Sequence, residues 1–125
     1  MTKKEILKQN QRITNNTILG ILDRRDNFLK INNCEEYKRL YSCRASYRKI
    51  YDEDGCKCYE LKSYHTVIAL TLITPTHIFF IDFLRYAYGY TATSAQHISK
   101  FFKLMSRTQN AWKSKEEVYY RYYPV

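Results

Sequence analysis

Two stretches of the sequence carry most of the information about the fold: Ser-Tyr-His-Thr-Val-Ile-Ala at residues 63–69, and Tyr-Gly-Tyr-Thr-Ala-Thr-Ser-Ala-Gln-His-Ile-Ser-Lys-Phe-Phe at residues 88–102. From Tyr64 to Ile73 the run is β-branched and apolar on both faces, which is typical of a strand covered on both sides. Residues 74–77 form a turn in which the fixed φ of Pro75 fits. A second apolar run at 78–88 then ends at Gly89. Together the two runs predict a β-hairpin.

A helix is predicted directly after this hairpin. Thr93 can cap its first turn and Gln96 can return the hydrogen bond, which makes a capping box. Apolar residues then recur at helical spacing and predict one buried stripe: Ala95, Ile98, Phe101, Phe102 and Met105. Such a stripe needs a sheet to cover, so we expect the helix to pack on the hairpin.

The same segments resemble a family of small, uncharacterised phage and plasmid proteins of low-GC Gram-positive bacteria. Its members share a Ser-Tyr-x-Thr-x-Ile-Ala strand start and a Tyr-(Ser/Thr)-x-Thr-(Thr/Ser)-x-x-His-Ile-x-x-Phe junction, which residues 63–69 and 90–101 match. The match covers roughly a third of the chain, and the second apolar run is longer and more aromatic than is usual in the family. The resemblance implies a fold tendency and a mobile-element origin, and it assigns no catalytic residue.

Length and composition predict a single domain over residues 1–125, because 45% apolar residues can build one core but not two. Within it we expect a helical part at 1–33, a sheet with its helix at 42–107, and an aromatic segment at 108–125. Residues 34–41 read as one or two further helical turns.

The fold class that these patterns indicate is α+β: a small antiparallel sheet of about four strands, with N-terminal helices and a helix after the central hairpin. A helix starting near Thr17 would bury its apolar residues, which are Ile18, Leu19, Ile21, Leu22, Phe28 and Leu29. Residues 42–61 predict two strands joined by a polar turn at 52–55. In the first of them Ala45, Tyr47 and Tyr51 would face the core, and the alternating residues would form a basic face.

The C-terminal aromatic residues, Trp112 and the run at 118–123, leave three alternatives open. They can complete the core, add a strand to the sheet edge, or form a surface that binds a partner.

The net charge of +9 comes from 21 Lys and Arg against 12 Asp and Glu, and it is spread along the chain. A folded body with this charge favours nucleic acid, an acidic protein surface or anionic lipid. Residues 66–90 are long enough to span a bilayer, but Pro75, His77, Asp82 and Arg85 interrupt them and favour the hairpin. The first residues lack the apolar core of a secretory signal, so we expect a cytoplasmic protein in a bacterial host cell.

No catalytic constellation stands out. Cys34 and Cys43 have no partner at the spacing usual in zinc sites, so the four cysteines, which include Cys56 and Cys58, are expected to be reduced thiols without metal. His97 is expected to be structural, hydrogen-bonded at the junction between strand and helix. There is no glycine-rich phosphate loop. We therefore expect a protein that is not an enzyme and uses no cofactor or small-molecule substrate.

Basic residues interleaved with tyrosines indicate binding instead, with guanidinium groups on phosphates and rings on bases. The alternative is a half-buried strand whose charges only face water. The candidate binding residues are Arg39, Arg44, Tyr47, Arg48, Lys49, Lys100, Lys103 and Arg107.

Two functions follow from these expectations. The first is a counter-defence protein of a phage or mobile element, an anti-CRISPR inhibitor that binds a host ribonucleoprotein effector, or its nucleic acid, in fixed ratio. The second is a basic nucleic-acid-binding accessory or regulatory protein of such an element. The charge excludes an acidic mimic of DNA for either role.

Overall fold

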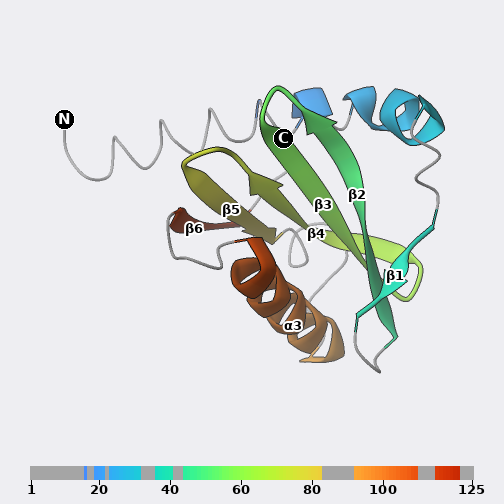
Figure 1. Ribbon diagram of the computed structural model, residues 1–125. Helices are drawn as coiled ribbons and strands as arrows, with labels where there is room; N and C mark the ends of the chain where they lie inside the picture. Colours follow the sequence, from blue (N-terminus) through green and yellow to red (C-terminus); the bar gives the residue numbers. More distant parts are fainter. Residues whose placement is uncertain are drawn as a thin grey trace.

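The computed structural model describes residues 16, 19–21, 23–31, 36–40, 44–82, 92–109 and 115–121. These residues form an α+β fold around a six-stranded sheet of order β1-β2-β3-β4-β5-β6 (Figure 1). The strands and the helix that follows them have these bounds: β1 (Lys38–Arg39), β2 (Ala45–Glu53), β3 (Cys56–Ser63), β4 (Thr66–Ile73), β5 (His77–Asp82), α3 (Ala92–Gln109) and β6 (Glu116–Arg121). Residues 23–31 are helical and precede the sheet.

Helices cover both faces of the sheet. On one face, α3 packs Ile98, Phe101 and Met105 into a core with strand residues that include Phe80. On the other face, Ile21, Phe28 and Leu29 of the N-terminal helical part pack on the strand side chains that point away from α3, such as Leu70 and Leu72. Leu19 is exposed, contrary to expectation, and Ile18 and Leu22 lie outside the described residues.

The predicted central hairpin is present. β4 is buried on both faces along most of its length, as its apolar sequence indicated. The turn at residues 74–77 is closed by the Thr74 amide, which donates to the His77 carbonyl at 2.9 Å. β5 ends at Asp82, and the rest of the second apolar run lies outside the described residues.

The β2–β3 hairpin has the predicted polar turn, and the backbone conformation of two turn residues explains how so short a turn can join the strands. Asp54 and Gly55 both have positive φ, 56° and 75°, which is the backbone of a type I′ turn. A register shift between Lys49 and Tyr51 forms a bulge in β2. Because of that bulge Tyr51 packs on the face opposite Ala45, so the prediction that the two share a face is wrong.

The prediction of about four antiparallel strands is too low by two edge strands. Residues 38–39 pair with β2 as a short strand, although residues 34–41 were expected to be helical. At the other edge β6 lies parallel to β5 after the crossover through α3, so the sheet is mixed. This edge strand is one of the three alternatives for the C-terminal segment.

The helix α3 has the predicted apolar stripe but begins at Ala92, so Thr93 lies inside its first turn instead of capping it. Among the described residues, no helix has both the length and the apolar character needed to cross a membrane.

Candidate nucleic-acid interface

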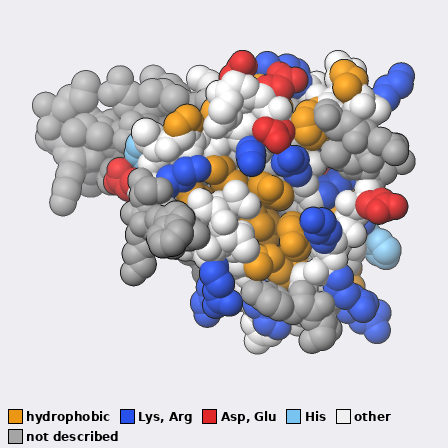
Figure 2. All heavy atoms as spheres, in the orientation of Figure 1, with side chains coloured by type: hydrophobic (Ala, Val, Ile, Leu, Met, Phe, Trp, Pro, Cys, Tyr) orange, Lys and Arg blue, Asp and Glu red, His pale blue; other side chains and the backbone are white. Residues whose placement is uncertain are grey.

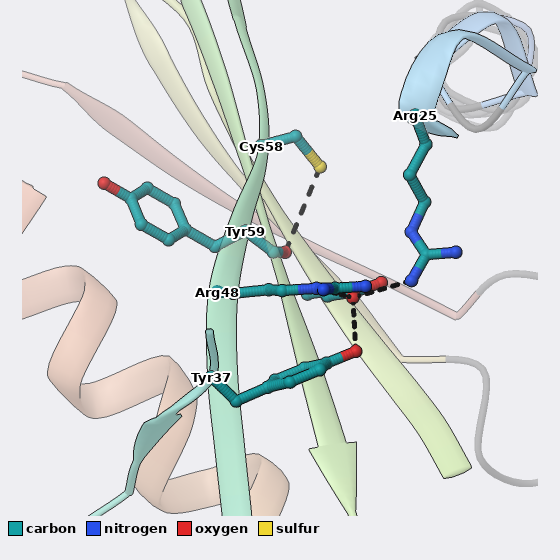
Figure 3. A network of polar contacts seen from close by, with 6 residues as sticks. Arg25, Tyr37, Arg48, Cys58 and Tyr59 are labelled. Carbon is teal, nitrogen blue, oxygen red and sulfur yellow. Dashed lines mark hydrogen bonds and ion pairs between the residues drawn. The ribbon is translucent and has the colours of Figure 1, made fainter. Parts of the chain in front are cut away.

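A buried carboxylate organises the sheet face opposite α3. Glu60 of β3 is 1% exposed, and its Oε1 accepts three hydrogen bonds (Figure 3). The donors come from three separate segments: Arg25 Nη2 at 2.8 Å, Tyr37 Oη at 2.7 Å and Arg48 Nε at 2.7 Å. Glu60 therefore joins the N-terminal helical part, the segment before β1, and β2.

The charge on Glu60 is stabilised by these donors. Burial by itself would raise the pKa of this carboxyl group, but the hydrogen bonds from Arg25, Tyr37 and Arg48 outweigh it and lower the pKa. The carboxylate is thus ionised near neutral pH, and its charge offsets two buried or half-buried guanidinium groups.

The ring of Tyr37 extends this cluster toward the surface. The Arg48 guanidinium carbon lies 4.2 Å from the ring centroid, and Lys62 Nζ lies 3.9 Å from it. Burial and the hydrogen bond to Glu60 raise the pKa of the Tyr37 hydroxyl to about 12, so it stays a donor.

A hollow of about 370 Å³ opens beside the cluster, and the ring of Tyr37 forms part of its wall. Two exposed arginines line it: Arg39, in β1, and Arg44, which directly precedes β2. None of the described lining residues is acidic; they are Tyr37, Arg39, Arg44, Ala45, Ser46, Tyr64 and His65. The hollow is therefore positively charged and partly aromatic.

Tyr64 stands at the rim of this hollow in an unusual backbone conformation. It has a φ of 57° in the two-residue connection between β3 and β4, where glycine or asparagine is the usual residue. Tyr64 is 53% exposed, and the centroid of its ring lies 6.1 Å from the centroid of the His97 ring. A tyrosine kept in a strained turn and facing solvent is a candidate functional residue.

The candidates from β1 and β2 separate into different environments. Arg39 and Arg44 share the hollow, whereas Arg48 turns inward to Glu60 with 13% of its side chain exposed. Lys49 pairs with Asp52 at 2.8 Å. Tyr47 packs its ring 6.1 Å from that of Phe101. Of these five, the hollow brings together the two arginines.

The three candidates on α3 share an exposed side of the helix, because they are spaced at i, i+3 and i+7. Lys103 and Arg107 line a second hollow beside β6, and Lys100 lies near enough to His97 to lower its pKa. The sequence of α3 contains no acidic residue. Figure 2 shows Lys and Arg side chains spread around a hydrophobic patch near the middle of the face in view.

The pair Ser63–His97 has the hydrogen bond that nucleophilic catalysis requires, with Oγ and Nδ1 2.8 Å apart. Both residues are buried, and burial followed by the charge of Lys100 lowers the pKa of His97. Their hydrogen bond ties α3 to the end of β3. His97 is therefore hydrogen-bonded to a strand, as expected, but to the end of β3; the junction between strand and helix lies outside the described residues.

Two of the four cysteines, Cys56 and Cys58, lie in the described part of the chain. Cys58 is buried, which raises the pKa of its thiol, and Cys56 is half-buried; both are free. Cys34 and Cys43 lie outside the described residues. Within the described part of the chain, no group of three or more His, Cys, Asp or Glu is placed to hold a metal ion.

Several residues of the cluster and hollow were not predicted from the sequence as binding residues, among them Arg25, Glu60, Lys62, Tyr64 and His65. One signal for Glu60 was available, since it is the one acidic residue in the sequence of β3 and falls two residues after the buried Cys58. Tyr64 and His65 looked like the start of a strand, because their turn contains no glycine, asparagine or proline.

No protein-family model matches the chain, and searches of curated proteins and solved structures found no match.

Proposed function

We propose that this protein binds nucleic acid without catalysing a reaction, and that the hollow between Arg39, Arg44 and Tyr64 is a principal contact. The observation that carries the proposal is the pairing of two exposed arginines with an exposed tyrosine in one hollow. The described residues that line this hollow include no carboxylate to neutralise the arginines.

The chemistry of these side chains fits a phosphodiester with an accessible base. A guanidinium can donate two parallel hydrogen bonds to phosphate oxygens, which is stronger than one contact from an ammonium group. The ring of Tyr64 offers a face for stacking, and Ser46 and His65 add polar groups to the wall. The carboxylate of Glu60, close behind the wall, is already paired with Arg25 and Arg48.

Titration of fluorescently labelled oligonucleotides, followed by anisotropy over a range of salt concentrations, tests this proposal. The variant Arg39→Gln/Arg44→Gln removes two charges from the hollow. The matched control Lys30→Gln/Lys57→Gln removes two exposed charges from the N-terminal helical part and from the opposite end of β3.

The hollow variant should lose at least tenfold in affinity, and its slope of log affinity against log salt should become shallower by about 2 units. The control should keep most of the affinity and the slope. Equal losses in both variants, or no binding by the wild-type protein, would contradict the proposal.

A counter-defence role is the second candidate function. The family resemblance of residues 63–69 and 90–101 favours it, and the same arginine hollow could bind the guide RNA of an effector. A pull-down from host cells that carry a CRISPR system tests this role. Recovery of one nuclease complex at a fixed ratio, lost with Arg39→Gln/Arg44→Gln, supports it; recovery of bare nucleic acid without the nuclease contradicts it.

A further inference from the structure

A second hollow of about 380 Å³ lies between α3 and β6. One side of α3 forms its helical wall, because the contributing residues follow the helical spacing i, i+3, i+4, i+7 and i+8. They are Ser99, Phe102, Lys103, Ser106 and Arg107. Tyr119 of β6 forms the opposite wall. We call this hollow the α3–β6 groove.

Tyr119 is an exposed aromatic residue held by other rings. Its side chain is 61% exposed, although its ring stacks on Phe80 at a centroid distance of 4.7 Å and an interplanar angle of 19°. Phe102 packs edge-on against Tyr119 at 6.1 Å and lies 5.0 Å from Phe80. Because Phe80 is fully buried, the Tyr119 ring rests on the core.

Two basic residues and one acidic residue lie near the ring of Tyr119. Lys103 and Arg107 are one helical turn apart on the α3 wall, about 6 Å between Cβ atoms. Glu117 is the neighbouring acidic group: its carboxylate accepts a hydrogen bond from the Ser106 hydroxyl and a 3.3 Å hydrogen bond from the Tyr119 hydroxyl. Glu117 therefore helps to orient the tyrosine but opposes an anion in the groove.

We infer that the α3–β6 groove binds one unpaired nucleobase on the ring of Tyr119, with the adjoining phosphates on Lys103 and Arg107, so that the ligand of this protein is a single strand. The inference rests on the proposed function and narrows it. Bases in a duplex are stacked on both neighbours and cannot offer a face to Tyr119, whereas an unpaired base can. A ring preorganised by Phe80 and Phe102 loses little freedom on binding.

The test compares single strands with duplexes of the same sequence. Tyr119→Val removes the ring but keeps a residue suited to a strand, and Tyr119→Phe is its matched control because it keeps the stacking face. Tyr119→Val should weaken single-strand binding five- to twentyfold, whereas Tyr119→Phe should weaken it less than twofold. Neither variant should change binding to the duplex. A single strand that contains 2-aminopurine should show weaker fluorescence quenching with Tyr119→Val than with wild type or Tyr119→Phe, because Tyr64 in the other hollow can still stack on a base.

Two further variants leave the aromatic packing intact. Lys103→Gln/Arg107→Gln, on the exposed side of α3, should weaken single-strand binding and make its salt dependence shallower. Glu117→Gln should tighten binding, because it removes the opposing charge while keeping groups that can hydrogen-bond.

The outcomes separate this inference from the proposed function. If Arg39→Gln/Arg44→Gln weakens binding but Tyr119→Val, Lys103→Gln/Arg107→Gln and Glu117→Gln do not alter it, the inference is wrong and the proposed function stands. If wild-type protein prefers the duplex, the inference is also wrong. If wild-type protein binds neither form, both ideas fail.

Discussion

Arg48 and Glu60 face each other directly across β2 and β3, and Arg48 Nε donates to Glu60 Oε1 at 2.7 Å. This cross-strand pair is buried beneath the N-terminal helical part, which adds Arg25 to the same oxygen. A buried ion pair of this kind is strongly destabilising to break, because the remaining charge is left without a partner.

Replacing Glu60 should therefore lower stability substantially. We expect Glu60→Gln to reduce the free energy of unfolding by about 3 kcal/mol, measured by chemical denaturation near neutral pH. The control Glu53→Gln changes an exposed carboxylate on β2 and should change stability by less than about 0.5 kcal/mol. Because folding lowers the pKa of Glu60, the stabilisation is present above its ordinary value of 4.5 and lost as the pH falls below it. The difference between wild type and Glu60→Gln should shrink in that acidic range, and a constant difference would contradict this assignment.

The Tyr37 hydroxyl should stabilise the protein at neutral pH and lose this effect in alkali. Tyr37→Phe removes one hydrogen bond to a carboxylate and should cost about 1.5 kcal/mol. The folded protein raises the pKa of Tyr37 from 10.0 to about 12, so the stabilisation is complete below pH 10 and lost as the pH rises through 12. Burial also raises the pKa of Tyr51 and Tyr59, so the quantity to measure is the difference between wild type and Tyr37→Phe at each pH. A difference that grows above pH 10 would refute the prediction.

His97 should make stability sensitive to mild acid. Since folding lowers the pKa of this histidine below its usual 6.5, its contribution is present above 6.5 and is lost as the pH falls from that value. We expect the unfolding free energy of the wild type to begin to drop as the pH falls through 6.5, above the range in which Glu60 is protonated. His97→Asn should remove most of that drop while retaining a partner for Ser63. His77→Asn replaces a histidine outside the Ser63–His97 pair, one that contacts the exposed Glu116, and serves as the comparison variant.

We expect the tyrosine at position 64 to lower the stability of the protein and to strengthen its binding to oligonucleotides. Asparagine tolerates positive φ better than tyrosine, so Tyr64→Asn should leave the unfolding free energy unchanged or raise it by up to about 1 kcal/mol. The same variant should weaken oligonucleotide binding several-fold, because the exposed ring at the rim of the hollow is lost. Thermal denaturation and anisotropy on one preparation measure both effects. A variant that is less stable and binds normally would indicate that Tyr64 has a packing role alone.

The parts of the fold that hydrophobic periodicity controls could be predicted. The apolar run of β4, the turn at 52–55 and the stripe of α3 all appear as expected, since burial imposes their patterns. β1 could not be predicted, because Lys38 and Arg39 are held by pairing with Tyr47 and Ser46 and not by an apolar pattern of their own. The face of Tyr51 depends on a bulge, which shifts the alternation without leaving a mark in the residue types.

The residue types that line the candidate site are among those the sequence analysis selected, but their arrangement could not be predicted. Basic residues alternating with tyrosines indicated a charged face, and Arg39 and Arg44 do line a hollow. The partner of Arg48 is more than ten positions away, so the burial of its guanidinium depends on strand register and not on local sequence. Tyr64 and Tyr119 are contributed by a tight turn and an edge strand, where sequence patterns are weak.

Tyr37 belongs to two systems at once, since its hydroxyl holds Glu60 and its ring forms part of the wall of the arginine hollow. Occupancy of the hollow and integrity of the folded state are therefore thermodynamically linked. A ligand bound against this ring would favour the state in which the N-terminal helical part, the segment before β1 and the first two long strands are joined. At a fixed ligand concentration, the stabilisation it gives should increase with the logarithm of its affinity, and the melting temperature should rise accordingly. By the same reciprocity, weakening the Glu60 cluster should loosen the ligand even though no residue in direct contact with it has changed.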